Sequence, residues 1–203
     1  MKANMKKAIV AAVMAAGATM SGSVMAASAT EKGVVVSVAN NLDLRVVIPA
    51  FLYFRVGTDT ATIDRITFSP TPAQLGNSTP IAGTGGDAAA GSGANVAVRG
   101  NNGQVTITTT VTGGGTGMGT GTASDGFINY NQIATTSSDA ANFPAPVLSN
   151  TGAAALNVVL GGGPAGAGKV TVRTAVWTYA YANTTVPSAG TYNGTVTYTA
   201  AMP

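Results

Sequence analysis

Apolar and polar side chains alternate with particular regularity in residues 34–48. The odd positions of this stretch include Ser37, Asp43 and Arg45, and the even positions are apolar except for Asn40. The apolar even residues, which we call the comb, are Val34, Val36, Val38, Leu42, Leu44, Val46 and Ile48. Because successive side chains of a strand point to opposite faces, this pattern predicts a strand with one apolar face and one polar face.

Further apolar runs, separated by turn-forming residues, predict strands along the rest of the chain. Pro49 interrupts the comb, and residues 51–56 form a more continuously apolar run that ends at Gly57. Other expected strands cover residues 62–68, 94–98, 104–111, 127–133, 154–160, 170–181 and 191–199. In residues 104–111 the apolar odd positions oppose a row of threonines, which indicates one buried and one solvated face. About nine short strands with turns between them predict an all-β fold of the β-sandwich type.

The apolar face of residues 170–181 changes partway along the stretch. The apolar residues at even positions are Val170, Val172 and Val176, and those at odd positions are Trp177, Tyr179 and Tyr181. A β-bulge near Ala175, or a strand that crosses between sheets there, would account for the change.

Aromatic residues near the end of the chain have two interpretations. They either line a sugar-binding face or belong to the core, and their spacing of two residues favours the core, with hydroxyl groups at its rim. The set consists of Trp177, Tyr179, Tyr181, Tyr192 and Tyr198.

Three lysines at the start of the chain precede an apolar stretch. Lys2, Lys6 and Lys7 are followed by the mainly apolar residues 8–20 and then by small residues, with cleavage expected after Ala26. This order predicts a secretory signal peptide over residues 1–26. The apolar stretch is shorter than the roughly 20 residues that a membrane span needs, so we expect an exported mature chain without a membrane span.

Removal of the signal peptide balances the charges. Three of the ten basic residues lie in it, and the other seven equal the seven Asp and Glu residues in number. A neutral chain lacks the basic surface that binds nucleic acid or anionic membranes, so we expect no nucleic-acid partner. Near-zero net charge also favours assembly, because copies of the chain do not repel one another.

The chain offers few reactive side chains. It contains no Cys and no His, which excludes disulfides, thiol and imidazole catalysis, and metal sites built from Cys and His. The scattered carboxylates form no acidic loop of the kind that calcium requires. We therefore expect no enzymatic activity, no catalytic residues, no cofactor and no metal site.

Two glycine-rich stretches resemble ligand-binding motifs. Residues 163–170 nearly match a phosphate-binding loop, but Val170 stands where the motif needs Ser or Thr, and a predicted strand follows where it needs a helix. Residues 82–87 resemble one unit of a calcium-binding repeat that binds ions only between stacked copies. We interpret both stretches as surface loops.

Both ends of the expected mature chain resemble one family. Residues 30–38, Thr-Glu-Lys-Gly-Val-Val-Val-Ser-Val, are similar to the N-terminal extension of cysteine-free fimbrial major subunits of the chaperone-usher class, particularly the alpha-type fimbriae. Residues 187–198, in which a Gly-Thr-Tyr turn leads into an alternating strand, resemble the C-terminal strand of the same group. The resemblance is confined to these two segments.

The resemblance implies a fold and a domain organisation. In such fimbriae each subunit is an incomplete Ig-like β-sandwich, and the N-terminal extension of the next subunit supplies the missing strand. By this resemblance, residues 27–41 form the extension and residues 42–203 the Ig-like pilin domain, with residues 31–39 as the donor strand.

The same resemblance implies site residues and partners. Val34, Val36 and Val38 would be donated to the neighbour. Tyr192, Val196 and Tyr198 would lie in the C-terminal strand beside the acceptor groove. The partners would be identical subunits in a homopolymer, a periplasmic chaperone and an outer-membrane usher. The filament would be an extracellular fimbria on the surface of a Gram-negative bacterium, supporting adhesion or biofilm formation.

Physical reasoning agrees with strand donation. An unpaired apolar comb is an aggregation hazard, and donation to a neighbour satisfies both its backbone and its side chains. A head-to-tail contact of this kind does not close, so it builds a fibre. The comb is longer than one donor strand needs, and residues 42–48 are either part of the donated strand or the first strand of the subunit's own body, with Asn40 and Asn41 as a hinge.

A second hypothesis remains open at this point. The chain would be a self-contained secreted β-sandwich that binds a carbohydrate or a surface protein, with residues 33–48 folded into its own sheet. The two hypotheses differ in what this stretch does, since a fibre subunit needs it for assembly and a monomeric module needs it for its own stability.

Overall fold

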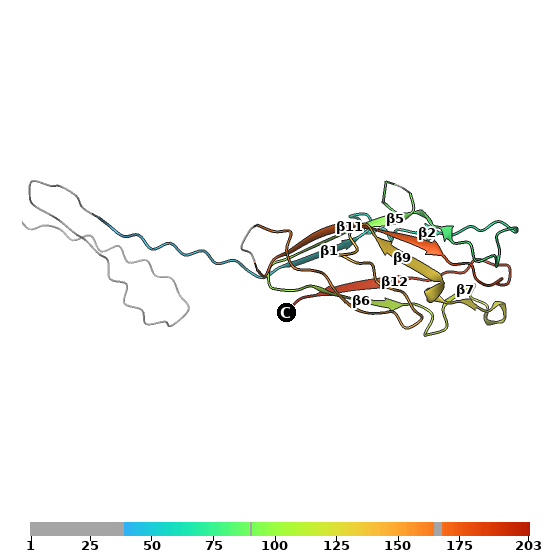
Figure 1. The fold of residues 1–203 in the computed structure, drawn as a ribbon. Helices are drawn as coiled ribbons and strands as arrows, with labels where there is room; N and C mark the ends of the chain where they lie inside the picture. The colour runs from blue at the N-terminus through green and yellow to red at the C-terminus, as the bar shows by residue number, and fades with distance from the viewer. Residues whose placement is uncertain (1–38, 90, 165–167) are drawn as a thin grey trace, which may run out of the picture. The chain divides into compact units, whose positions relative to one another are not determined.

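The computed structural model describes residues 39–89, 91–164 and 168–203, and this part of the chain is all-β (Figure 1). The predicted fold class is thus confirmed at the level of all-β structure with several antiparallel sheets. The 3-10 helices are η1 (Ala123–Asp125) and η2 (Tyr130–Gln132). The strands are β1 (Leu52–Val56), β2 (Ile66–Thr67), β3 (Ile81–Ala82), β4 (Thr84–Gly85), β5 (Gly93–Gly100), β6 (Thr106–Val111), β7 (Met118–Gly119), β8 (Phe127–Ile128), β9 (Ile133–Ser137), β10 (Ala153–Asn157), β11 (Thr171–Tyr181) and β12 (Val196–Ala201).

The chain divides into two units, Met1–Val47 and Ile48–Pro203. In the first unit, the described residues 39–47 contain no strand or helix. Of the two alternatives for residues 42–48, the structure does not show the body's own first strand, because the first strand of the body begins at Leu52. A strand needs a paired edge to be stable in water, and alternation alone does not supply one.

The second unit contains a five-stranded sheet with the order β1-β5-β11-β3, in which β9 also pairs with β11. All of these pairs are antiparallel. The long strand β11 is central because β5 pairs with it over Thr171–Thr178 and β9 pairs with it over Trp177–Tyr181.

The bulge or crossing expected near Ala175 is wrong. β11 pairs with β5 in unbroken register from Thr171 opposite Gly100 to Thr178 opposite Gly93. Ala175 and Trp177 are buried on one face, whereas Val176 is only partly buried on the other. The change of apolar face in the sequence therefore reflects one regular strand with a buried face at the odd positions and a partly covered face at the even positions.

The second sheet has the order β10-β6-β12 and is antiparallel. Its middle strand follows the predicted alternation, with Ile107 buried and Thr108 and Thr110 exposed. The pairing of β10 with β6 shifts register between Ala153 and Leu156, which marks a bulge in β10.

Two expected strands are interrupted by local turns. Of residues 62–68 only Ile66 and Thr67 form a strand, because the Asp64 carboxylate accepts a hydrogen bond from the Thr58 backbone N–H at 2.6 Å and holds the preceding residues in a turn. Residues 127–133 are likewise divided by η2, so that β8 and β9 belong to different sheets.

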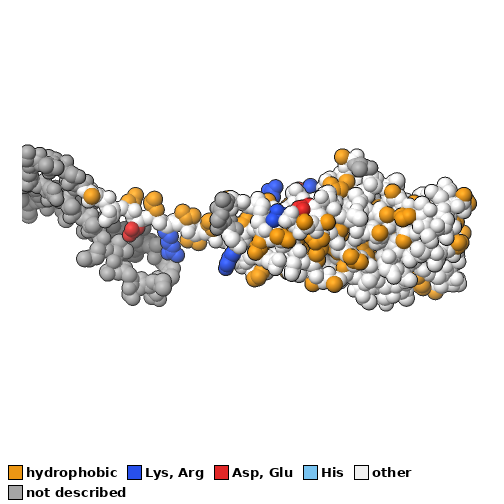
Figure 2. Space-filling view, in the orientation of Figure 1, with side chains coloured by type: hydrophobic (Ala, Val, Ile, Leu, Met, Phe, Trp, Pro, Cys, Tyr) orange, Lys and Arg blue, Asp and Glu red, His pale blue; other side chains and the backbone are white. Residues whose placement is uncertain are grey.

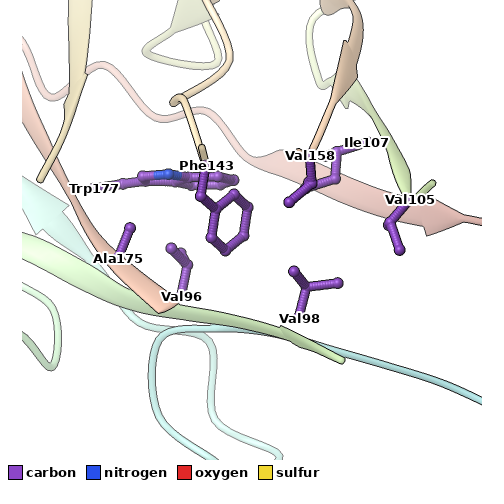
Figure 3. Packing of buried hydrophobic residues seen from close by; sticks show 8 residues of the cluster. All are labelled: Val96, Val98, Val105, Ile107, Phe143, Val158, Ala175 and Trp177. Carbon is purple, nitrogen blue, oxygen red and sulfur yellow. The ribbon is translucent and has the colours of Figure 1, made fainter. Parts of the chain in front are cut away.

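One hydrophobic cluster is shared by the two larger sheets. Phe143, from the loop between β9 and β10, lies among Val96 and Val98 of β5 and Trp177 of β11 (Figure 3). Its ring meets the indole of Trp177 edge-on, with centroids 5.4 Å apart. Ile107 of β6 completes the cluster from the other sheet, so the core joins the five-stranded sheet to the three-stranded sheet.

Candidate strand-pairing site

Two strands at the ends of their sheets lie next to each other. Among the residues that the structure describes, β1 pairs only with β5, and β12 pairs only with β6. Residues of β1 and β12 nevertheless approach one another, and no strand pairing joins them within the described residues (Figure 1). Each sheet therefore presents an unpaired edge on the same side of the shared core.

The hydrogen-bond pattern shows which backbone groups face these edges. The Gly57 N–H donates to the Asn95 carbonyl at 2.8 Å, so odd-numbered residues of β1 point their backbone groups toward β5. Backbone groups alternate in direction along an antiparallel strand. Those of Leu52, Phe54 and Val56 consequently point to the open edge of β1.

The open edge of β12 follows from the same argument. The Thr112 N–H donates to the Thr195 carbonyl at 3.0 Å, which continues the ladder between β6 and β12. The next residue along, Val196, therefore points its N–H and C=O away from β6, as do Tyr198 and Ala200.

The side chains of these same residues face the core but are incompletely covered. They are partly buried, whereas Val96 and Val98 of the neighbouring strand β5 are 1% and 0% exposed. We define the β1/β12 seam as the inward residues of both edges. They are Leu52, Phe54 and Val56 of β1, Val196, Tyr198 and Ala200 of β12, and Met202 just beyond β12.

The two sides of the seam converge at one end. An ideal Cβ atom built on Gly100 would lie 3.1 Å from Met202 Sδ and 3.5 Å from Leu52 Cδ1. Side chains from both edges therefore pack over the same glycine of β5. Gly100 leaves room for this convergence, because a larger residue would press against both side chains.

Tyr198 connects the seam to the core. Its ring centroid lies 5.3 Å from that of Trp177, and its hydroxyl lies 3.1 Å from the hydroxyl of Tyr179. Burial raises the pKa of both Tyr179 and Tyr198 above the usual 10.0. Tyr198 is the one ionisable residue among those that define the seam, and a tyrosine is neutral at pH 7, so the seam residues are uncharged, as suits an apolar occupant.

The structure places the expected C-terminal site residues in two groups. Val196 and Tyr198 lie in β12 and line the seam. Tyr192 precedes β12 and stabilises the loops beside it. Its hydroxyl donates a hydrogen bond to the carbonyl of Asp125 or Ser188, each 3.0 Å away. The expected donor residues Val34, Val36 and Val38 lie outside the described residues.

Sequence reasoning did not identify Leu52, Phe54 and Val56 as site residues. Residues 51–56 were expected to form a buried strand, and nothing in the sequence marks β1 as an end strand. Strand order decides which strand lies at an edge, and it depends on contacts between distant residues, such as Leu52 opposite Gly100.

The second half of the comb lies in the described part of the chain and is exposed. Leu42, Leu44, Val46 and Ile48 are 82%, 85%, 83% and 75% exposed. Figure 2 shows the hydrophobic side chains of this segment in orange. Large apolar side chains at alternate positions and in contact with water indicate an interaction surface.

Of the remaining sequence motifs, the glycine-rich loop around Asp87 and the aromatic residues of β11 have structural roles. The Asp87 carboxylate accepts a hydrogen bond from the Asn95 N–H at 2.7 Å and so stabilises its own loop. Trp177 and Tyr181 are 0% and 4% exposed, which confirms that they belong to the core. Within the described ranges, no three Asp, Glu, His or Cys residues gather as metal ligands, and no helix is long and apolar enough to cross a membrane.

Comparisons with protein-family models, with curated proteins and with solved structures each found no match. The functional argument therefore depends on the seam and the comb.

Proposed function

We propose that this protein is the structural subunit of an extracellular filament that is assembled by donor-strand exchange. In this proposal its body is an incomplete Ig-like β-sandwich. The N-terminal extension of a neighbouring copy supplies the missing strand. The carrying observation is that the described part of the chain has both a pair of adjacent unpaired sheet edges and the exposed second half of the comb, Leu42 to Ile48, at strand spacing.

A strand inserted between β1 and β12 would satisfy both edges at once. Because a strand paired on both sides needs about 9.5 Å between its two neighbours, β1 and β12 would move apart where they now approach each other. The backbone of the inserted strand would pair with the open N–H and C=O groups of Phe54 and Tyr198 and their neighbours, and its inward side chains would cover the partly buried seam. Each fully buried apolar side chain contributes about 1.5–3 kcal/mol, and each backbone hydrogen bond about 0.5–1.5 kcal/mol. A joint with three or four such side chains is strong enough to hold a filament together.

Donation between copies produces a fibre. The donated segment and the acceptor seam are different surfaces, so each copy can accept one strand and donate another without closing the chain of contacts. The balanced charge of the mature chain adds no repulsion between copies. The filament would support adhesion or biofilm formation at the surface of a Gram-negative bacterium.

Before assembly the unpaired edges need protection. Two open edges and the exposed residues 42–48 in one chain favour uncontrolled pairing. A periplasmic chaperone and an outer-membrane usher, the partners implied by the resemblance of both chain ends to chaperone-usher subunits, would cover the seam until a neighbour occupies it.

The test compares the intact chain with a chain that lacks residues 31–48. Both are expressed for export, sheared from the cells, imaged by negative-stain electron microscopy and run unboiled on an SDS gel. We expect filaments and a ladder of SDS-resistant oligomers from the intact chain only. Emission of the single tryptophan, Trp177, checks that the shortened body is folded.

Monomers in both samples would refute the proposal. The alternative would then be a self-contained binding module, which predicts a well-folded monomer for the intact chain and a destabilised one for the shortened chain.

A further inference from the structure

The length of the seam limits how much of the comb can be donated. Four inward positions follow one another on the β12 side, from Val196 to Met202. With a rise of about 3.4 Å per residue they span about 20 Å. The whole comb from Val34 to Ile48 would span about 50 Å. One seam therefore accepts only about half of the comb.

The second half of the comb matches the β12 side of the seam in number and spacing. Leu42, Leu44, Val46 and Ile48 are four apolar residues at every second position, as are the four inward positions from Val196 to Met202, whereas β1 offers three. The first half offers three valines, and Asn40 follows where a fourth apolar residue would stand. The larger side chains of the second half also fill more of an incompletely covered core.

Exposure gives an independent reason to choose the second half. If residues 31–39 alone were donated, the joint itself would leave Leu42, Leu44 and Val46 uncovered, and each is more than 80% exposed in the single chain. Each such side chain gains about 1.5–3 kcal/mol on full burial. An assembly that buries them is favoured over one that leaves them in water.

The polar face of the segment fixes its orientation in the seam. Asp43 and Arg45 alternate with the apolar residues, so they face solvent when the even positions face the core. A slip of one residue would turn both charges into the core of the neighbour, at a large desolvation cost. The segment therefore fits the seam with one face only.

We propose that residues 42–48 are the segment that occupies the β1/β12 seam of a second copy, with Leu42, Leu44, Val46 and Ile48 facing its core. This inference rests on the proposed function and assigns the donor to a segment different from Val34–Val38. Only three residues separate Ile48 from β1. In a filament built in this way, the body of each copy would therefore lie close to the body of the copy that accepts its strand.

Neighbouring valines provide a matched pair of variants. Val46 and Val47 have the same side chain and are 83% and 74% exposed, but only Val46 belongs to the comb. We expect Val46→Asn to reduce the SDS-resistant ladder at least tenfold, because it places an amide in the neighbour's core. Val47→Asn leaves the ladder unchanged, because its side chain faces solvent.

Engineered disulfides test the location directly, because the chain contains no cysteine. Asp43→Cys, Arg45→Cys and Val47→Cys are each combined with Thr199→Cys, which replaces an exposed residue on the outer face of β12. Paired strands bring opposite residues within the 4.4–6.8 Å between Cα atoms that a disulfide spans. We expect at least one combination to give a covalent ladder on a non-reducing gel, and each single variant to give none.

The outcomes separate this inference from the proposed function. No ladder from the intact chain would overturn both. A ladder that is lost in Val36→Asn but kept in Val46→Asn would leave the filament standing and overturn the assignment of residues 42–48. Equal loss in Val46→Asn and Val47→Asn would also overturn it.

A disulfide within one chain would overturn the inference in another way. It would run as a fast-migrating monomer and would show that residues 42–48 fold back beside β12 of the same copy.

Discussion

Tyr198 joins the open edge of β12 to the buried core. Its ring packs against Trp177, and its hydroxyl lies 3.1 Å from that of Tyr179. For Tyr198, burial is the largest cause of the raised pKa, and the neighbouring Tyr179 raises it further. Both hydroxyls are therefore held in the neutral form more strongly than in the unfolded chain.

This pair predicts a loss of stability at alkaline pH. Because the folded pKa values of Tyr179 and Tyr198 lie above 10.0, the unfolded chain releases these protons at a lower pH than the folded chain does. The stabilising contribution is complete below about pH 10 and is lost as the pH rises through and beyond that value. Urea unfolding between about pH 8 and pH 11 measures the decline.

A tyrosine-to-phenylalanine substitution assigns this effect to the pair. Tyr198→Phe removes one ionisable group, so its free energy of unfolding should fall less steeply with pH. Tyr53→Phe, at a residue that is 38% exposed, is the control and should follow the unmodified chain. The same steep decline in Tyr198→Phe would contradict the explanation.

At the scale of the element, the pairing of β10 with β6 depends on a tight turn at a glycine. Gly152 has φ +94° and lies directly before β10, and a Cβ atom there would overlap the Thr109 carbonyl oxygen of β6. Gly121 has φ +96° but no atom within 4 Å of its ideal Cβ position. The two glycines thus share a backbone conformation and differ in the space around them.

Replacing each glycine by alanine separates conformation from crowding. Gly121→Ala should cost about 1–2 kcal/mol, the penalty for a left-handed backbone conformation. Gly152→Ala should cost about 1–3 kcal/mol more, because the backbone of β6 must also move. Urea denaturation followed by Trp177 fluorescence gives both values. Equal costs would show that the loop before β10 shifts freely.

At the scale of the whole molecule, one core cluster connects the two larger sheets. Phe143 touches residues of the five-stranded sheet and is 0% exposed, and Ile107 brings the three-stranded sheet into the same cluster. Sheets that share a core lose their packing together, so we expect the second unit to unfold in a single transition.

Phe143→Ala tests this coupling. It should lower the free energy of unfolding by about 3–5 kcal/mol, because a large buried ring is lost. Tryptophan fluorescence, which reports on β11, and far-UV circular dichroism, which reports on all strands, should show the same midpoint. Phe127→Ala is the control, since Phe127 is 46% exposed and should cost little. Separate midpoints for the two probes would contradict a shared core.

Local pattern in the sequence determined the class of the protein and many of its strands. Alternation and apolar runs predicted strands at residues 51–56, 94–98, 104–111 and 170–181, and β1, β5, β6 and β11 lie there. These predictions succeeded because side-chain alternation in a strand is a property of neighbouring residues. Two-residue strands such as β3 and β7 leave too short a pattern to be seen.

Only the tertiary structure decided which edges remain open. The sequence shows an apolar strand at Leu52–Val56 and an alternating strand at Val196–Ala201, but not that both lie at the ends of their sheets and beside each other. The same holds for residues 42–48, whose alternation predicts a strand but not the edge that pairs with it. Pairing partners are chosen by contacts between residues far apart in the chain, so the comb could be read from the sequence and the seam could not.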